Sequence, residues 1–379
     1  FLLDAGLNNT QAFLANAAFT LGQVFFEIPT GVVADTRGRR FSFLLGTATL
    51  LASTLLYVAM WWLRAPLWGW LVASILIGLG FTFFSGATEA WLVDALHASG
   101  VTEGLDAVFG RAQIVTGVAM LTGSVLGGVL AQLTNLGAPY LARAGLLAVT
   151  MVVAWALMRD LGFIPDAAAH PLAAVRTVLA GAVDGGLRNP PVRWLMIAGV
   201  FTAGTGIYVF YALQPFLLQL YGHPDAYSVA GLAAALVAGA QILGGLLARW
   251  TPRLFRHRTT VLIAAFAANT LVLVGLGLVN SLAAALVLVA VWSMVSAIAV
   301  PVRQAFVNGL IPSAQRATVL SFDSLMGSAG GVVTQPALGR AADVSGYPAS
   351  YLVSAAIQAV SVPFAVLARR ERAASDPTR

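Results

Sequence analysis

Three acidic residues, Glu27, Glu89 and Asp323, lie within mainly apolar runs of the sequence. A charge there is costly and usually functional. Glu27 precedes Asp35 by eight residues and Asp323 follows Arg316 by seven, so these two acids have comparable depths. In neighbouring helices, burial and mutual repulsion would favour protonation of one of them near neutral pH. All three are therefore candidates for proton coupling. The alternatives are a local partner for Glu27, a water-facing Asp323, and binding of a cationic substrate by Glu89.

A second set of residues combines aromatic surface with hydrogen-bonding groups, as a small-molecule site requires. Some of them stand shortly before Pro215, which interrupts the hydrogen bonds of a helix. Arg143 lies near the outer end of its run and either reaches lipid headgroups or lines a cavity that favours anions. For each of the others, packing or lipid contact is the alternative. The candidates for a substrate cavity are Tyr208, Tyr211, Gln214, Phe81, Phe84, Gln241 and Arg143.

The runs that position these residues are long enough to cross a bilayer as helices. The 379 residues are 59% hydrophobic and 9% charged, with a mean hydropathy of +0.85, whereas a soluble globular protein carries about 25% charged residues. This composition excludes soluble enzymes, nucleic-acid binders and disordered proteins, and predicts an all-α integral membrane protein. The eleven predicted spans are 11–33, 41–62, 67–95, 109–133, 138–158, 192–219, 227–249, 259–279, 282–308, 317–338 and 347–368.

The basic residues indicate which ends of the spans face the cytoplasm. All 21 are arginine and the formal net charge is +6. Because short loops rich in arginine stay on the cytoplasmic side, we place 18 of the 21 there and leave only Arg64, Arg143 and Arg340 elsewhere. This clustering is a topology signal and not a nucleic-acid surface. With no cysteine and four scattered histidines, neither a metal site nor a cofactor is expected.

The chain is predicted to contain two helical bundles. The segment 161–190 is the one long polar connection, and Arg111-Ala112 recurs as Arg316-Ala317, each followed by a glycine cluster. Internal repeats of this kind are typical of secondary transporters. We predict an N-terminal bundle over 1–160, a cytoplasmic linker over 161–190 and a C-terminal bundle over 191–379. The orientation of the first span calls for a preceding helix, so the sequence is expected to lack most of helix 1 of twelve.

The ten residues Gly31 to Arg40, GVVADTRGRR, stand where the first span leaves the membrane. Glycine allows a tight turn, an acid can cap a helix N-terminus and arginines mark the cytoplasmic side. The motif resembles the signature loop of the major facilitator superfamily, and the resemblance continues through SGATEAWLVDAL (Ser85 to Leu96) and RATVLSF (Arg316 to Phe322).

The resemblance implies two six-helix bundles and an inner latch, in which Asp35 caps the predicted span 317–338 and the arginines contact acids near the predicted span 67–95. A turn that only sets the topology is the alternative. The corresponding loop of the second half, GGLLARWTPRLFRHR, has no acid at the position of Asp35, so a one-sided latch is expected. The latch residues are Gly31, Asp35, Arg37, Gly38, Arg39, Arg40, Asp94 and Arg111.

Glycines in the fourth predicted span resemble the antiporter motif of drug-exporting members of the superfamily. They are Gly110, Gly123, Gly127 and Gly128, while Ala119 and Ser124 depart from that pattern. The third span also lacks the arginine that drug exporters tend to carry. Small residues four apart let helices pack closely in any membrane bundle, so the motif and simple packing both stay open.

The resemblance implies a secondary active transporter of the cytoplasmic membrane that works by alternating access. Proton-coupled efflux of hydrophobic small molecules or drugs is the main expectation; transport of a specific polar metabolite, such as a sugar, peptide or siderophore, is the alternative. An enzyme is not expected, because the sequence has no HExxH, GxSxG or GxxxxGK[ST] motif. The expected partners are a small-molecule substrate, protons and the lipid bilayer, and a monomer is expected.

Overall fold

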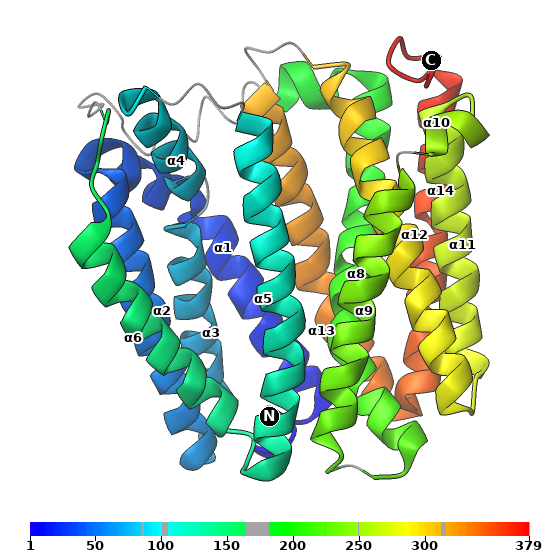
Figure 1. Ribbon diagram of the computed structural model, residues 1–379. Helices are drawn as coiled ribbons and strands as arrows, with labels where there is room; N and C mark the ends of the chain where they lie inside the picture. Colours follow the sequence, from blue (N-terminus) through cyan, green and yellow to red (C-terminus); the bar gives the residue numbers. More distant parts are fainter. Residues whose placement is uncertain are drawn as a thin grey trace. The chain divides into compact units, whose positions relative to one another are not determined.

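The computed structural model describes residues 1–84, 87–100, 105–163, 182–223, 225–248, 250–311 and 316–378 (Figure 1). All regular elements in these ranges are helices, apart from one isolated β-bridge between His257 and Pro377. Ten segments of the described chain are long and apolar enough to cross a membrane. The predicted all-α membrane fold is thereby confirmed.

The chain divides into two compact units. One comprises Phe1–Val118 with Leu133–Arg176, and the other Ala119–Gln132 with Thr177–Arg379. Helix α5 (Leu105–Leu133) therefore contributes its residues 119–132 to the second unit. Most of the predicted linker lies outside the described residues, and its last part forms the short π-helix η1 (Ala182–Leu187). The bundle boundaries at 160 and 191 stay predictions.

The first unit contains a close helix contact at a pair of glycines. A Cβ atom on Gly22 would lie 2.6 Å from the carbonyl oxygen of Ile75, and one on Gly78 would lie 3.1 Å from the Cα atom of Gly22. The absence of side chains lets the two backbones approach closely, as in other membrane bundles. The helices of this unit are α1 (Asn9–Arg37), α2 (Arg39–Trp62), α3 (Leu67–Thr82), α4 (Ala87–Ala98) and α6 (Ala138–Leu157), with the start of α5.

One predicted span of the first unit is interrupted. The sequence predicts a single helix over 67–95, whereas α3 ends at Thr82 and α4 begins at Ala87. Residues 85 and 86 lie outside the described residues. Interrupted membrane helices are tolerated where the freed backbone groups find partners in the protein or in water.

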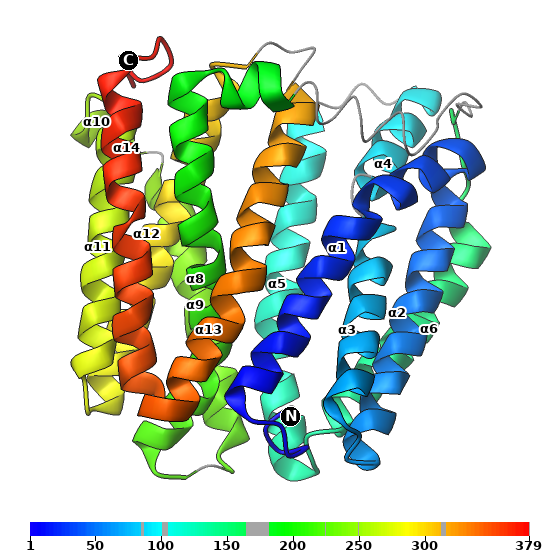
Figure 2. The same cartoon turned by 180° about the vertical axis from the view of Figure 1, so that it is seen from behind.

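The second unit is built around the long helices α8 and α13, which lie side by side in Figure 2. A Cβ atom on Gly204 of α8 would lie 2.8 Å from the Cα atom of Gly331 of α13. Helix α13 contains the predicted span 317–338 and the first part of the predicted span 347–368, which continues into α14. Gly346, between the two parts of α13, is non-helical with φ 82°. The helices of this unit are α8 (Pro190–Tyr221), α9 (Tyr227–Ala248), α10 (Thr251–Leu254), α11 (Arg258–Leu278), α12 (Leu282–Asn308), α13 (Arg316–Ala359) and α14 (Ser361–Arg370).

Candidate functional site

The predicted latch motif forms the tight connection between α1 and α2. Helix α1 ends at Arg37, Gly38 has φ 104°, and α2 begins at Arg39. This backbone conformation favours glycine. A Cβ atom on Gly38 would also collide with the carboxylate of Asp160. Asp35 forms an ion pair with Arg39, one turn further along the chain.

An acid that the sequence analysis missed closes this connection. The backbone N–H of Arg40 donates to Oδ1 of Asp160 at 2.8 Å, and its guanidinium donates to the carbonyl oxygen of Trp155 at 2.6 Å. Asp160 thus caps the N-terminus of α2 from the segment that follows α6, which satisfies a donor left free by the helix. An acid shortly after the end of a span is the signal that could have identified it.

The wider latch stays a prediction. Asp94 is partly buried on α4, and the side chain of Arg111 lies outside the described residues. Gly31 has nothing within 4 Å of a Cβ position, and Arg37 lies over the ring of Phe41 at 5.5 Å. The described contacts of the motif therefore stabilise the connection between α1 and α2, and they do not extend to the other residues of the predicted latch.

A charged pair within the second unit joins three helices. The guanidinium of Arg303 on α12 donates to both carboxylate oxygens of Asp323 on α13, at 2.7 and 2.6 Å. It also donates to the carbonyl oxygen of Leu195 on α8 at 3.2 Å. A Cβ atom on Gly199 would lie 3.4 Å from the guanidinium, so this glycine leaves room for the pair. The side chains are only 25% and 10% exposed, which makes the bidentate pair a partly desolvated one.

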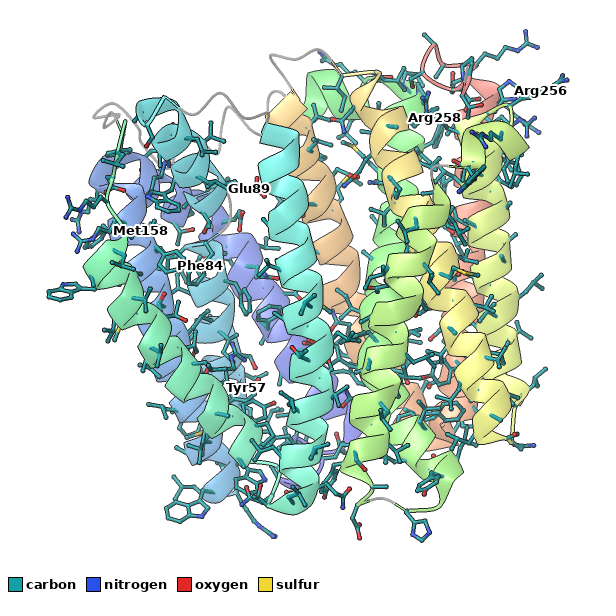
Figure 3. The ribbon with its side chains drawn as sticks, viewed as in Figure 1. Tyr57, Phe84, Glu89, Met158, Arg256 and Arg258 are labelled. Carbon is teal, nitrogen blue, oxygen red and sulfur yellow. The ribbon has the colours of Figure 1, made fainter. Side chains whose placement is uncertain are left out.

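The three proton-coupling candidates have different surroundings. Glu27 on α1 and Glu89 on α4 are exposed, and Figure 3 shows Glu89. Asp323 is only 10% exposed and forms an ion pair with Arg303, which the sequence analysis did not foresee. The shared environment expected for Glu27 and Asp323 stays a prediction, because the two acids belong to different units.

The cavity candidates on α8 lie on different faces of the helix. Tyr208 is fully buried, donates its hydroxyl to Ser350 and packs edge-on against Tyr351 with ring centroids 6.3 Å apart. Tyr211 is 48% exposed, and Gln214 is also exposed. Tyr208 therefore lies in the packed interior of the second unit, whereas the other two share an open face.

The remaining cavity candidates are distributed over both units. Phe81 is exposed and meets Phe19 edge-on at 5.7 Å. Phe84 is partly buried and meets Phe43 edge-on at 4.8 Å (Figure 3). Arg143 is partly buried on α6, and Gln241 is exposed on α9. The structure does not bring these four residues together into one binding site among the described residues.

The glycines of α5 do not behave alike. A Cβ atom on Gly128 would lie 2.9 Å from the Cα atom of Gly231 on α9, whereas Gly123 and Gly127 have nothing within 4 Å. Gly110 lies in a part of α5 whose side-chain surroundings are not described. Close helix packing therefore accounts for Gly128, and an antiporter role for the group stays a prediction.

The sequence matches the family profile described as Major Facilitator Superfamily over residues 2–291. No curated protein matches it. The fold is similar to that of a mutant of the nucleoside transporter NupG, with a TM-score of 0.81, 11% identity and coverage of 97% of this chain and 92% of that chain. A second NupG structure has a TM-score of 0.75 and 12% identity, with coverage of 97% of this chain and 92% of that chain. The POT family transporter PepTSo has a TM-score of 0.70 and 14% identity, with coverage of 96% of this chain and 90% of that chain. The membrane-length helices, the signature loop and the match over most of the chain show that this protein belongs to the major facilitator superfamily, as a multi-pass membrane transporter.

Proposed function

We propose that this protein is a secondary active transporter of the cytoplasmic membrane that moves a specific polar small molecule by alternating access between two helical bundles. The observation that carries this proposal is the exposed face of α8 formed by Tyr211 and Gln214. These residues are three apart and hence about 60° apart around the helix. The residues between them, Ala212 and Leu213, are buried.

An exposed amide on a membrane-length helix favours a water-filled path over contact with lipid. Leaving an amide without hydrogen bonds in hydrocarbon costs several kcal/mol. Gln214 would avoid this cost beside a polar substrate or water. An aromatic ring next to an amide suits a flat polar molecule, since the ring stacks while the amide donates and accepts hydrogen bonds.

The likeness to a nucleoside transporter also supports a polar substrate over a hydrophobic drug. A nucleoside combines a flat ring with several hydrogen-bonding groups, which is the chemistry that the face of α8 would suit. In α5, the glycines that resemble the antiporter motif have a described packing partner only at Gly128. Drug efflux accordingly becomes the second candidate.

The exposed acids Glu27 and Glu89 are the groups we propose for proton coupling. A charge is costlier to place in hydrocarbon than an amide, so exposed carboxylates on these two helices favour contact with water or substrate over contact with lipid. Asp323 is the weaker candidate, since both of its carboxylate oxygens already accept hydrogen bonds from Arg303.

Transport in proteoliposomes tests the proposed substrate class. With an imposed pH gradient, we expect a panel of labelled nucleosides, sugars, peptides and siderophores to contain a transported solute, and lipophilic dyes to remain unmoved. Gln214→Ala should raise the KM for that solute about tenfold, the effect of one lost hydrogen bond of roughly 1.4 kcal/mol. Gln219→Ala, an exposed amide on another face of α8, is the matched control. Dye movement that a protonophore abolishes, with no polar solute transported, would refute the proposal in favour of drug efflux.

A further inference from the structure

Two segments far apart in the sequence meet at one end of the second unit. The first, residues 250–258, contains α10 and the start of α11; the second, residues 369–378, contains the end of α14 and the C-terminal tail. Figure 1 shows the C-terminus beside α10 and α11, and Figure 3 shows Arg256 and Arg258 at this end. The arginine distribution predicts that it faces the cytoplasm.

A buried acid docks the tail onto the first segment. Both carboxylate oxygens of Asp376 accept hydrogen bonds from Thr259, from its backbone N–H at 2.8 Å and its hydroxyl at 2.9 Å. Asp376 is only 3% exposed. Its own carbonyl oxygen accepts from the backbone N–H of Arg258 at 2.8 Å, and the hydroxyl of Thr378 donates to Phe255 at 2.7 Å. The carboxylate thus caps the N-terminus of α11.

Docking of the tail leaves a strongly basic surface. The two segments contain six arginines and two acids, Glu371 and Asp376. Glu371 accepts from the indole of Trp194 at 3.0 Å, and Asp376 is used in the cap. Arg258 donates to the carbonyl oxygen of Pro377 at 2.8 Å. The other five arginines are exposed; they are Arg253, Arg256, Arg369, Arg370 and Arg372.

Apolar side chains beside these arginines suit the membrane interface. Leu254 is 77% exposed and Trp250 is 40% exposed. The guanidinium of Arg253 lies 4.2 Å from the centre of the Trp250 ring. Tryptophan is enriched at the depth of lipid headgroups, and arginines at the cytoplasmic surface attract anionic lipids.

We propose that residues 250–258 and 369–372, held together by the docked tail, form a binding surface for the headgroups of anionic phospholipids in the cytoplasmic leaflet. The exposed arginines contact the phosphate, Trp250 and Leu254 enter the interface, and Asp376 acts as a positioning residue. The direction in which removal of Asp376 changes lipid affinity therefore distinguishes this proposal from attraction by net charge alone. If net charge alone governed binding, removal of this acid would strengthen the attraction for anionic lipid, whereas loss of the assembled surface weakens it.

Lipid binding to the purified protein tests the surface directly. Phosphatidylglycerol and phosphatidylcholine are titrated into the protein in a nonionic detergent, and bound lipid is counted by native mass spectrometry. We expect selective phosphatidylglycerol binding, and a loss of about 25-fold in the variant Arg253→Gln with Arg256→Gln, at about fivefold per arginine. Arg64→Gln with Arg340→Gln makes the same charge change at exposed positions outside this surface. Equal losses in both variants, no loss in the first, or equal competition by inorganic phosphate would overturn the proposal.

The positioning role of Asp376 is tested with two variants. Asp376→Ala removes the cap and a negative charge, and Thr259→Val removes one hydrogen bond of the cap without changing the charge. Both should weaken phosphatidylglycerol binding several-fold and speed deuterium exchange at the Thr259 amide. If Asp376→Ala does not fold, Thr259→Val decides. Faster exchange at this amide with unchanged or tighter lipid binding would overturn the role of the tail.

Discussion

The partly desolvated pair of Arg303 and Asp323 illustrates how strongly one residue can depend on another. Each charge is stabilised by the other and by hydrogen bonds, so removal of one partner leaves a charge with poor solvation. Removal of both leaves no such charge. The same pair explains why Asp323 is a weak candidate for proton coupling, although its sequence environment resembles that of Glu27 and Glu89.

A double-mutant cycle tests the pair. Arg303→Leu alone should lower the free energy of unfolding by about 3 kcal/mol, and the double variant with Asp323→Leu should recover most of this loss. Reversible unfolding in mixed micelles measures both values. Additive losses in the double variant would show that the two side chains stabilise the protein independently.

At the scale of elements, glycine contacts set the distance between helices. The contact between α1 and α3 at Gly22 has a backbone carbonyl as its nearest group, which a repacked side chain cannot relieve. In the contact between α8 and α13, a Cβ atom on Gly204 would lie 2.8 Å from both the Cα atom of Gly331 and the Cβ atom of Thr334. Such contacts bring long stretches of helix into van der Waals range, where many weak attractions add up.

Substitution at one of these glycines should separate two helices. Gly22→Val is expected to destabilise the protein by about 2 kcal/mol, because a Cβ atom has no space against Ile75. Gly145→Val in α6, where nothing lies within 4 Å, is the matched control and should be nearly neutral. Thermal unfolding of the two variants side by side distinguishes a tight contact from a general effect of valine.

In both units, the N-terminus of one helix is capped by an acid that follows a later helix of the same unit. Asp160 follows α6 and accepts from Arg40, the second residue of α2; Asp376 follows α14 and accepts from Thr259, the second residue of α11. Both hydrogen bonds measure 2.8 Å. The loop of the second half, which ends at Arg258, has no acid at the position of Asp35. The helix that starts there, α11, is nevertheless capped by Asp376 of the C-terminal tail.

Loss of the cap in the first unit should open the start of α2. Asp160→Ala is expected to cost about 1 kcal/mol and to speed deuterium exchange at the Arg40 amide. Asp225→Asn, at an exposed position in the second unit, serves as the control. Unchanged exchange at Arg40 in the alanine variant would mean that other groups hold the helix start.

At the scale of the whole molecule, the sequence predicts the parts that depend on composition and local pattern. Apolar runs locate most of the spans to within a few residues, and the signature loop identifies the superfamily. Contacts between helices depend on which faces meet, and no local pattern specifies this. The sequence could therefore not assign Arg303 to Asp323, Asp376 to Thr259, or Tyr208 to a packed interior.

Proton coupling is a property of the whole transport cycle, and exchange measurements isolate it. We expect Glu27→Gln with Glu89→Gln to abolish accumulation driven by a pH gradient while substrate exchange across the membrane continues. Substrate exchange needs the conformational change but no net proton movement. Continued exchange would therefore show that the double variant still folds and binds its substrate. Gradient-driven accumulation at the normal level would exclude these two acids as the coupling groups.

The turn at Gly346 leaves no slack between the two spans that it joins. The chain reverses direction within α13 across one non-helical residue (Figure 2), so neither arm has a loop that could absorb a displacement of the other. A displacement of the end of residues 316–345 therefore also displaces the start of residues 347–359. Evolution can lengthen many surface connections at little cost, but a single added residue here would rotate one arm against the other.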